Sequence, residues 1–319
     1  MAYIRLSIKF YNDFTMKVAI LSFILFLSIQ SAFAGDMDKV LYGDDNRVAF
    51  RDLSIKDENL INLAHSVLAQ VPLYKVSSED KNSISFRAKN ISDSFNMCSE
   101  ESYSDQPSLS NCSGFLVGSD LLMTAGHCIK ETTDCQKNFW ILDFDDDSTF
   151  DSENSKISID KEKIFTCSKI LAWSNTNNSD FALIKLNKKI KDRHIFKMHR
   201  LSHVKQEDSL FVIGHPLGMP KMFAMNAHVR ENYLPNQFKI TADTFSGNSG
   251  SPVVNLKTLS VEGILIKGEN DFKMDINLSC NRILECNESE CRGETVQRAS
   301  TLPFAILPNL SVEFLKNIP

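Results

Sequence analysis

The stretch that decides the fold is Asp243-Thr-Phe-Ser-Gly-Asn-Ser-Gly-Ser-Pro252, which the apolar pair Val253-Val254 follows. Within it, Ser249 stands between Asn248 and Gly250. A serine hydroxyl becomes a good nucleophile only with a base that takes its proton and backbone donors that hold the oxyanion. A neighbouring glycine lets the backbone turn those donors toward the hydroxyl. A polar turn before a buried strand has the same composition, so the interpretation depends on a base and a carboxylate upstream.

Both groups lie upstream. The segment from Cys112 to Cys128 has two apolar runs around a Gly-Ser-Asp turn and ends in Thr-Ala-Gly-His-Cys, which places His127. The segment Asn178-Ser-Asp-Phe-Ala-Leu-Ile-Lys-Leu186 places Asp180 at the start of an apolar run. A single histidine or aspartate is more often structural than catalytic. The three contexts together predict a triad in which Asp180 orients His127, and His127 activates Ser249.

These motifs resemble those of the trypsin-like (chymotrypsin-fold) serine peptidases, in which TAAHC or TAGHC, D-x-A-L-x-x-L and G-[DN]-S-G-[GS]-P carry the triad. The form GNSGSP and the stretch Gly214-His-Pro-Leu-Gly-Met-Pro220 resemble the bacterial glutamyl-endopeptidase-like (V8-like) branch. The resemblance covers roughly Cys98 to Cys291.

Short apolar runs broken by turns dominate the chain after Cys112, which favours an all-β sandwich or barrels. The expected strands are Phe139–Phe144, Ile157–Ile159, Ile164–Cys167, Phe181–Leu186, Leu210–Ile213, Phe238–Ile240, Val253–Val254 and Val261–Ile266. The resemblance implies two six-stranded antiparallel β-barrels and a short C-terminal helix near Leu307 to Phe314. It places His127 and Asp180 on the first barrel and Ser249 on the second.

The resemblance also implies the remaining site features. The backbone N–H groups of Gly247 and Ser249 would form the oxyanion hole, and a disulfide between Cys112 and Cys128 would hold the histidine loop. The substrate would be a protein or peptide, and no cofactor or metal would be needed.

Specificity is predicted from the position six residues before the nucleophile. Asp243 stands there, where trypsin-like enzymes place the acid that pairs with Arg or Lys of the substrate, and Gly268 would leave the pocket mouth open. The V8-like branch usually has no acid there, so cleavage after Glu is the alternative. A hydrogen-bonded loop role for Asp243 is a third possibility.

Two positions depart from the trypsin pattern. Lys267 stands where an aromatic residue is common, and it would neutralise the pocket if it reached Asp243. Asn248 stands where trypsin-like zymogens have the acid that pairs with a new N-terminal ammonium. Activity is therefore expected not to depend on that switch in the same form.

The first 34 residues have the features of a secretory signal peptide. A basic start at Met16-Lys17, which could be the true start, precedes the apolar run Val18 to Ile29 and the small-residue site Ala32-Phe-Ala34. The run is short for a membrane span, so no membrane anchor is expected after cleavage. Residues 35–95 are predicted to be an N-terminal arm or a propeptide, and 96–319 the peptidase domain. The absence of a dibasic site between Gly35 and Cys98 favours the arm.

Charge and cysteines limit the class of protein. The 319 residues carry 35 basic and 40 acidic side chains, which argues against nucleic acid as a partner. All eight cysteines follow the signal segment and none forms a CxxC pair, so disulfides in a secreted or periplasmic monomer are expected rather than zinc. A pair Cys135–Cys167 is suggested beside Cys112–Cys128. The partners of Cys98, Cys280, Cys286 and Cys291 stay open.

Other candidate sites rank lower. Four aspartates between residues 143 and 147 lack the glycine and the final glutamate of an EF-hand loop, so they predict an acidic hairpin tip. His215 is expected to be a turn residue. An α/β-hydrolase is disfavoured because Ser251 replaces the second glycine of its nucleophile motif. The alternative function is a catalytically silent homologue that serves as a binding module, although all three triad residues are present.

Overall fold

The computed structural model describes residues 41–53, 57–129, 132–199, 204–287 and 291–302. All of them belong to the unit Met37–Pro319 of the chain's two compact units. The predicted signal peptide and C-terminal helix lie outside the described residues. The helices that are described are short, and none has the length and apolar character of a membrane span.

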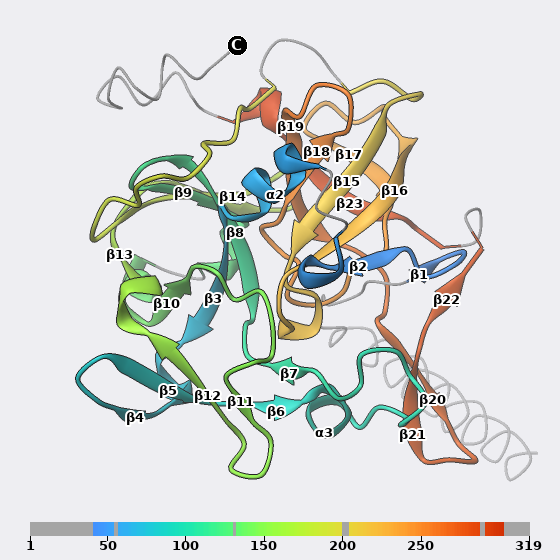
Figure 1. Cartoon of the computed structure of the whole chain (residues 1–319). Helices are drawn as coiled ribbons and strands as arrows, with labels where there is room; N and C mark the ends of the chain where they lie inside the picture. Colours follow the sequence, from blue (N-terminus) through green and yellow to red (C-terminus); the bar gives the residue numbers. More distant parts are fainter. Residues whose placement is uncertain (1–40, 54–56, 130–131, 200–203, 288–290, 303–319) are drawn as a thin grey trace, which may run out of the picture. The chain divides into compact units, whose positions relative to one another are not determined.

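The first barrel is closed and has six strands, in the order β10-β13-β14-β9-β8-β3 (Figure 1). Every pairing in it is antiparallel. Its strands are β3 (Val67–Pro72), β8 (Cys112–Gly118), β9 (Leu121–Thr124), β10 (Asn138–Ile141), β13 (Ile164–Thr176) and β14 (Ser179–Leu186).

The second barrel closes through the pairing of β15 with β16, in the order β15-β18-β19-β23-β17-β16. Its strands are β15 (Ser209–Gly214), β16 (Met222–Glu231), β17 (Gln237–Thr241), β18 (Pro252–Asn255), β19 (Val261–Lys267) and β23 (Glu294–Arg298). The prediction of two six-stranded antiparallel barrels is therefore confirmed.

Side chains on the two faces of the same strands form both the barrel cores and the interface between the barrels. Successive side chains of a strand point to opposite faces. In β8, Leu116 joins the core of the first barrel, whereas Phe115 joins a cluster shared with the second barrel. In β15, Val212 fills the second barrel and Ile213 lies in the shared cluster. The two barrels are thus held together by apolar side chains from both.

The segment 35–95 contributes to both barrels. Residues 41–53, called here the N-terminal arm, contain β1 (Leu41–Tyr42) and β2 (Arg47–Ala49), and β2 pairs with β16 as a seventh strand beside the second barrel. The same segment also contains the helix α2 (Glu58–Ala64), and β3 follows it. Because β3 completes the first barrel, removal of everything before residue 96 would open it. Cleavage within the undescribed residues stays a separate question.

Smaller elements complete the described part. A four-stranded sheet consists of β4 (Val76–Glu79), β5 (Ser83–Arg87), β11 (Phe150–Asp151) and β12 (Lys156–Asp160). Short pairs are formed by β6 (Lys89–Asn90) with β7 (Pro107–Ser108), β20 (Phe272–Asp275) with β21 (Cys280–Ile283), and β1 with β22 (Glu285–Cys286). A second short helix is α3 (Ile91–Phe95).

All eight cysteines are paired. The disulfides are Cys112–Cys128, Cys135–Cys167, Cys98–Cys280 and Cys286–Cys291. The two suggested pairs are confirmed, and the four cysteines left open form the other two bridges.

Candidate active site

His127 lies just after β9, in a tight turn that spans Gly126–Cys128. The disulfide Cys112–Cys128 ties this turn to the start of β8. The indole N–H of Trp173 donates to the carbonyl oxygen of Gly126 over 2.8 Å, which ties the turn to β13 as well. The histidine side chain keeps about a third of its surface exposed. The ring is therefore held in place and still open on one side.

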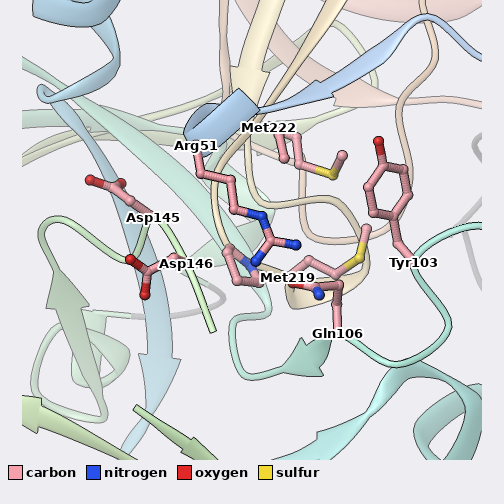
Figure 2. A pocket seen from close by; sticks show the side chains of 9 residues that line it. Arg51, Tyr103, Gln106, Asp145, Asp146, Met219 and Met222 are labelled. Carbon is pink, nitrogen blue, oxygen red and sulfur yellow. The ribbon is translucent and has the colours of Figure 1, made fainter. Parts of the chain in front are cut away.

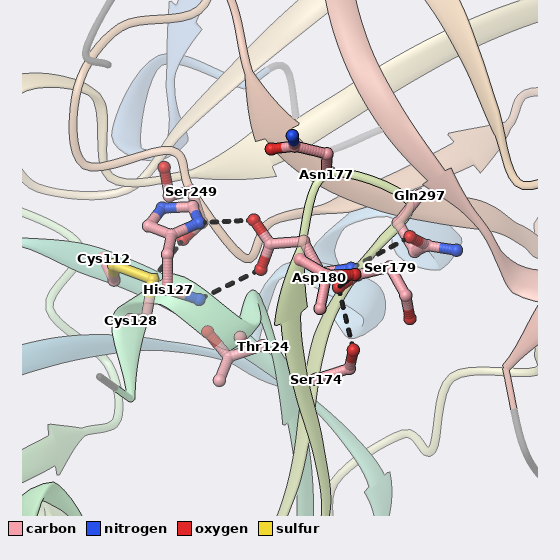
Figure 3. A network of polar contacts seen from close by, with 12 residues as sticks. Cys112, Thr124, His127, Cys128, Ser174, Asn177, Ser179, Asp180, Ser249 and Gln297 are labelled. Carbon is pink, nitrogen blue, oxygen red and sulfur yellow. Dashed lines mark hydrogen bonds and ion pairs between the residues drawn. A yellow bond between two sulfur atoms is a disulfide. The ribbon is translucent and has the colours of Figure 1, made fainter. Parts of the chain in front are cut away.

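Asp180 is the second residue of β14, and both of its carboxylate oxygens face His127 (Figure 3). One oxygen accepts the backbone N–H of His127 at 3.0 Å, and the other lies 2.8 Å from the ring Nδ1. The side chain of Asp180 is only 12% exposed. A carboxylate in this place favours the tautomer with the proton on Nδ1, which leaves Nε2 as the proton acceptor.

Ser249 lies on the segment 243–251, called here the nucleophile loop. Figure 3 draws Ser249 next to the ring of His127, on the side away from Asp180. Its carbonyl oxygen accepts the N–H of Ser113 at 2.8 Å, and the sulfur of Cys128 lies 3.7 Å from the same oxygen. Because β8 starts at Cys112, the loop from the second barrel rests directly on the first.

Gly250 makes this close approach possible. Its φ is +88°, and a Cβ atom there would collide with the carbonyl oxygen of Ser113 and with the hydroxyl of Thr124. Glycine is the residue that adopts such backbone angles and leaves such space. The glycine after Ser249 therefore brings the serine to the histidine-bearing barrel.

Gly247 lies in a turn that runs from Phe245 to Asn248. The N–H of Asn248 donates to the carbonyl oxygen of Phe245 at 2.9 Å, and the φ of Gly247 is +95°. A positive φ at the third position, with none at Ser246, defines a type II turn. Within the described part of the chain, no backbone acceptor is bonded to the N–H of Gly247.

Asp243 is almost completely buried beneath the N-terminal arm. One carboxylate oxygen accepts the N–H of Tyr42 at 2.7 Å, and the other accepts the N–H of Asn46 at 2.9 Å. Burial raises the pKa of Asp243 to about 6, and these two N–H groups partly offset that rise. Asp243 is therefore hydrogen-bonded to the arm, the third role that the sequence left open for it.

Gly268, the predicted mouth of the pocket, follows β19 and is buried, whereas Lys267 before it is exposed. Asn248 is also buried, and its side-chain oxygen lies 3.4 Å from the hydroxyl of Ser251. A neutral neighbour thus stands where a zymogen switch would need a charged one.

Two residues with structural roles at this site, Gln297 and Ser113, escaped the sequence analysis. Gln297 of β23 accepts the N–H of Asp180 at 3.1 Å, which links the second barrel to Asp180. Ser113 bonds the nucleophile loop through both its N–H and its hydroxyl. His215 was expected as a turn residue; it does begin a turn, but its ring is fully buried and stacks on Phe144. These contacts join segments far apart in sequence, so no local pattern signals them.

Asp143 and Asp145 both lie near the ring of His65, and each has a further basic partner. Asp143 pairs with Arg193 at 2.6 Å, and Asp145 pairs with the buried Lys221 at 2.7 Å. A small pocket beside them, seen in Figure 2, has Arg51, Tyr103 and Met219 among its lining residues. It is lined by neither His127 nor Ser249.

Comparison with known proteins bears on the family. Residues 112–264 match the family model described as "Trypsin-like peptidase domain". This match confirms the predicted resemblance to the trypsin-like serine peptidases, whose double barrel the chain shares.

Individual matches are more distant. A curated relative, "Secreted RxLR effector protein 73" of Plasmopara viticola, is 27% identical over 160 residues, which cover 45% of this chain and 38% of the relative. The chain thus matches less than half of that relative's length. A solved Glu endopeptidase in complex with MPD has a TM-score of 0.46 and 15% identity, and covers 87% of this chain and 98% of its own. The VesB protease of Vibrio cholerae has a TM-score of 0.43 and 12% identity, over 76% and 63%.

Proposed function

We propose that this protein is a secreted serine endopeptidase that hydrolyses peptide bonds through His127, Asp180 and Ser249. The observation that carries the proposal is the pair of contacts from Asp180 to the ring and backbone of His127, 2.8 and 3.0 Å long, beside the loop that bears Ser249. One carboxylate that fixes both the ring and its backbone suits a general base.

The proposed mechanism has an acylation step and a deacylation step. The hydroxyl of Ser249 attacks the peptide carbonyl carbon as Nε2 of His127 takes its proton. His127 then gives that proton to the leaving amine, and an acyl-enzyme remains on Ser249. Water, deprotonated by His127, attacks the ester carbon; the bond to Ser249 then breaks, His127 returns the proton to the Ser249 oxygen, and the acid product leaves. Asp180 stabilises the imidazolium in both steps, and the N–H groups of Gly247 and Ser249 stabilise the oxyanion.

Specificity separates into two testable proposals: cleavage after Arg or Lys, and cleavage after Glu. Asp243 would have to face the substrate to select a basic side chain, but both of its oxygens already accept N–H groups of the arm. This arrangement weighs against the first proposal. Digestion of a peptide library distinguishes the two proposals. The new C-terminal residues would be Arg or Lys under the first proposal and Glu under the second.

Export is proposed from the signal segment 1–34. Four disulfides are consistent with an oxidising compartment, and the curated relative is described as secreted. The N-terminal sequence of the exported protein tests this: a start at Gly35 supports the proposal, and retention of residues 17–34 contradicts it.

The second candidate is a catalytically silent double barrel that binds a partner. The test is hydrolysis of an unfolded protein substrate by wild type and by Ser249→Ala. The proposed function predicts new peptide termini with wild type alone. Equal absence of cleavage with both proteins, across substrates with Arg, Lys and Glu, would favour the silent binding module.

A further inference from the structure

The backbone carbonyl groups of the nucleophile loop accept hydrogen bonds from two segments that have no assigned role. The N–H of Leu217 donates to the carbonyl oxygen of Ser246 at 2.5 Å. The hydroxyl of Ser113 donates to the carbonyl oxygen of Gly247 at 2.8 Å. The backbone N–H of Ser113 donates to the carbonyl oxygen of Ser249, also at 2.8 Å. Three carbonyl groups around the nucleophile are thus bound by two residues outside the loop.

Peptide planarity turns these bonds into a constraint on the oxyanion hole. In a trans peptide the C=O of one residue and the N–H of the next point in opposite directions. Because Leu217 holds the carbonyl of Ser246, the N–H of Gly247 must point away from Leu217. The hydrogen bond from the Ser113 hydroxyl to the carbonyl of Gly247 fixes the peptide group on the C-terminal side of Gly247. A glycine could otherwise rotate freely at this position.

The hydroxyl of Ser113 has a defined direction. It accepts the backbone N–H of His215 at 3.0 Å, so its own proton is left for the carbonyl of Gly247. Ser113 is fully buried, where water cannot replace either bond. The hydroxyl therefore acts as a directional link between residue 215 and residue 247.

Backbone strain at Leu217 also indicates that this segment is held in a fixed conformation. Residues 215–218, called here the support loop, contain Leu217 at φ +52° and ψ +18°, a left-handed conformation that is uncommon for leucine. Such strain persists where the surroundings enforce it, and it concentrates at functional sites. Here the hydroxyl of Ser108 donates to the carbonyl of Leu217 at 2.7 Å, and Gly218 accepts the N–H of Leu109 at 2.8 Å.

We propose that Ser113, together with the support loop, is a positioning element that keeps the oxyanion hole formed before substrate binds. This inference rests on the proposed peptidase function. Ser113 does not touch the reacting atoms; it holds the carbonyl groups of Gly247 and Ser249, and so limits rotation of the backbone that follows each of the two N–H groups. The device also explains how a loop with Asn248 in place of the zymogen acid can hold its active shape.

The test compares Ser113→Ala with wild type and with Ser66→Ala. Ser66 is an equally buried serine whose hydroxyl has no hydrogen-bond partner among the described residues, so it is a matched control. We expect Ser113→Ala to lower kcat by about 10- to 100-fold, as a displaced catalytic group does, with KM changed less than about threefold. Affinity for a peptide boronate, which mimics the oxyanion, should fall by the same factor as kcat/KM. The midpoint of the pH–rate profile should stay unchanged, because the bonds from Asp180 to His127 are untouched.

Two further variants guard against a folding defect. Ser113→Thr keeps the hydroxyl and should retain most of kcat. Ser108→Ala should lower kcat, as Ser113→Ala does, because it removes the hydrogen bond to the carbonyl of Leu217. A kcat of Ser113→Ala equal to that of Ser66→Ala, or an effect on KM alone, would overturn the inference and leave the peptidase function standing. If Ser113→Ala does not fold, an unchanged kcat in Ser108→Ala overturns it instead. A wild type that neither cleaves peptides nor binds the boronate would overturn the proposed function itself.

Discussion

Asp180 binds His127 twice, once at the ring and once at the backbone, so a single side chain sets the orientation of the proposed base. A substitution that keeps its shape but removes its charge should disturb the proton position without moving the chain. Asp180→Asn is therefore expected to lower kcat by about 10⁴-fold, because an amide can face Nδ1 with its NH₂ group and favour the wrong tautomer. The measurement is the steady-state rate, with Asp120→Asn, on the neighbouring β8–β9 turn, as control. A loss below about tenfold would contradict the assigned role of Asp180.

Asp243 gives a prediction on pH. Its pKa in the folded protein is about 6, above the ordinary 3.8, because the carboxyl is buried. The folded state therefore keeps a proton that the unfolded state releases, and this group's contribution to stability is full below about pH 4 and falls as pH rises through 6. The free energy of unfolding of wild type minus that of Asp243→Asn should thus decrease from pH 4 to pH 7. Denaturant titrations at several pH values measure it, and a constant or rising difference would contradict the buried position.

At the scale of elements, the turn of His127 packs against β13 without room for a side chain at Gly126. A Cβ atom there would collide with backbone atoms of Ser174 and Phe181. Gly126→Ala is expected to destabilise the protein by more than about 2 kcal/mol and to displace His127, because backbone cannot yield as a side chain can. Gly118→Ala is the matched control, since the atoms nearest to its Cβ would belong to the side chain of Leu121 and not to backbone. Thermal melting and catalytic rate measure the two effects, and equal behaviour of both variants would contradict the packing argument.

The sequence predicts the elements that carry the proposed triad because each motif is local. The apolar run that follows Asp180 identifies this aspartate, and the Thr-Ala-Gly-His-Cys sequence at the end of β9 identifies His127, each from only a few neighbouring residues. Ser113, Gln297 and the arm over Asp243 were not predicted, because their partners lie more than 100 residues away along the chain. The primary role expected for Asp243 rested on its spacing from Ser249, and spacing along one loop says nothing about a strand that covers it.

At the scale of the whole molecule, long-range disulfides and the shared apolar cluster hold distant segments together. Cys98–Cys280 closes a loop of 182 residues, whereas Cys286–Cys291 closes one of 5. Closing a longer loop removes more conformational entropy from the unfolded chain. The double variant Cys98→Ala with Cys280→Ala is therefore expected to lose about 2–5 kcal/mol of unfolding free energy, and the corresponding Cys286, Cys291 variant less. Urea denaturation compares them; a larger loss for the short loop would contradict the entropic argument.

The central claim is that Ser249 is activated by its neighbours in the folded protein. Intact-mass analysis after treatment with a fluorophosphonate tests it most directly, with native wild type, heat-unfolded wild type and Ser249→Ala side by side. The account predicts one adduct, located on Ser249, in native wild type alone. An unlabelled native protein, or equal labelling of Ser249→Ala, would contradict it.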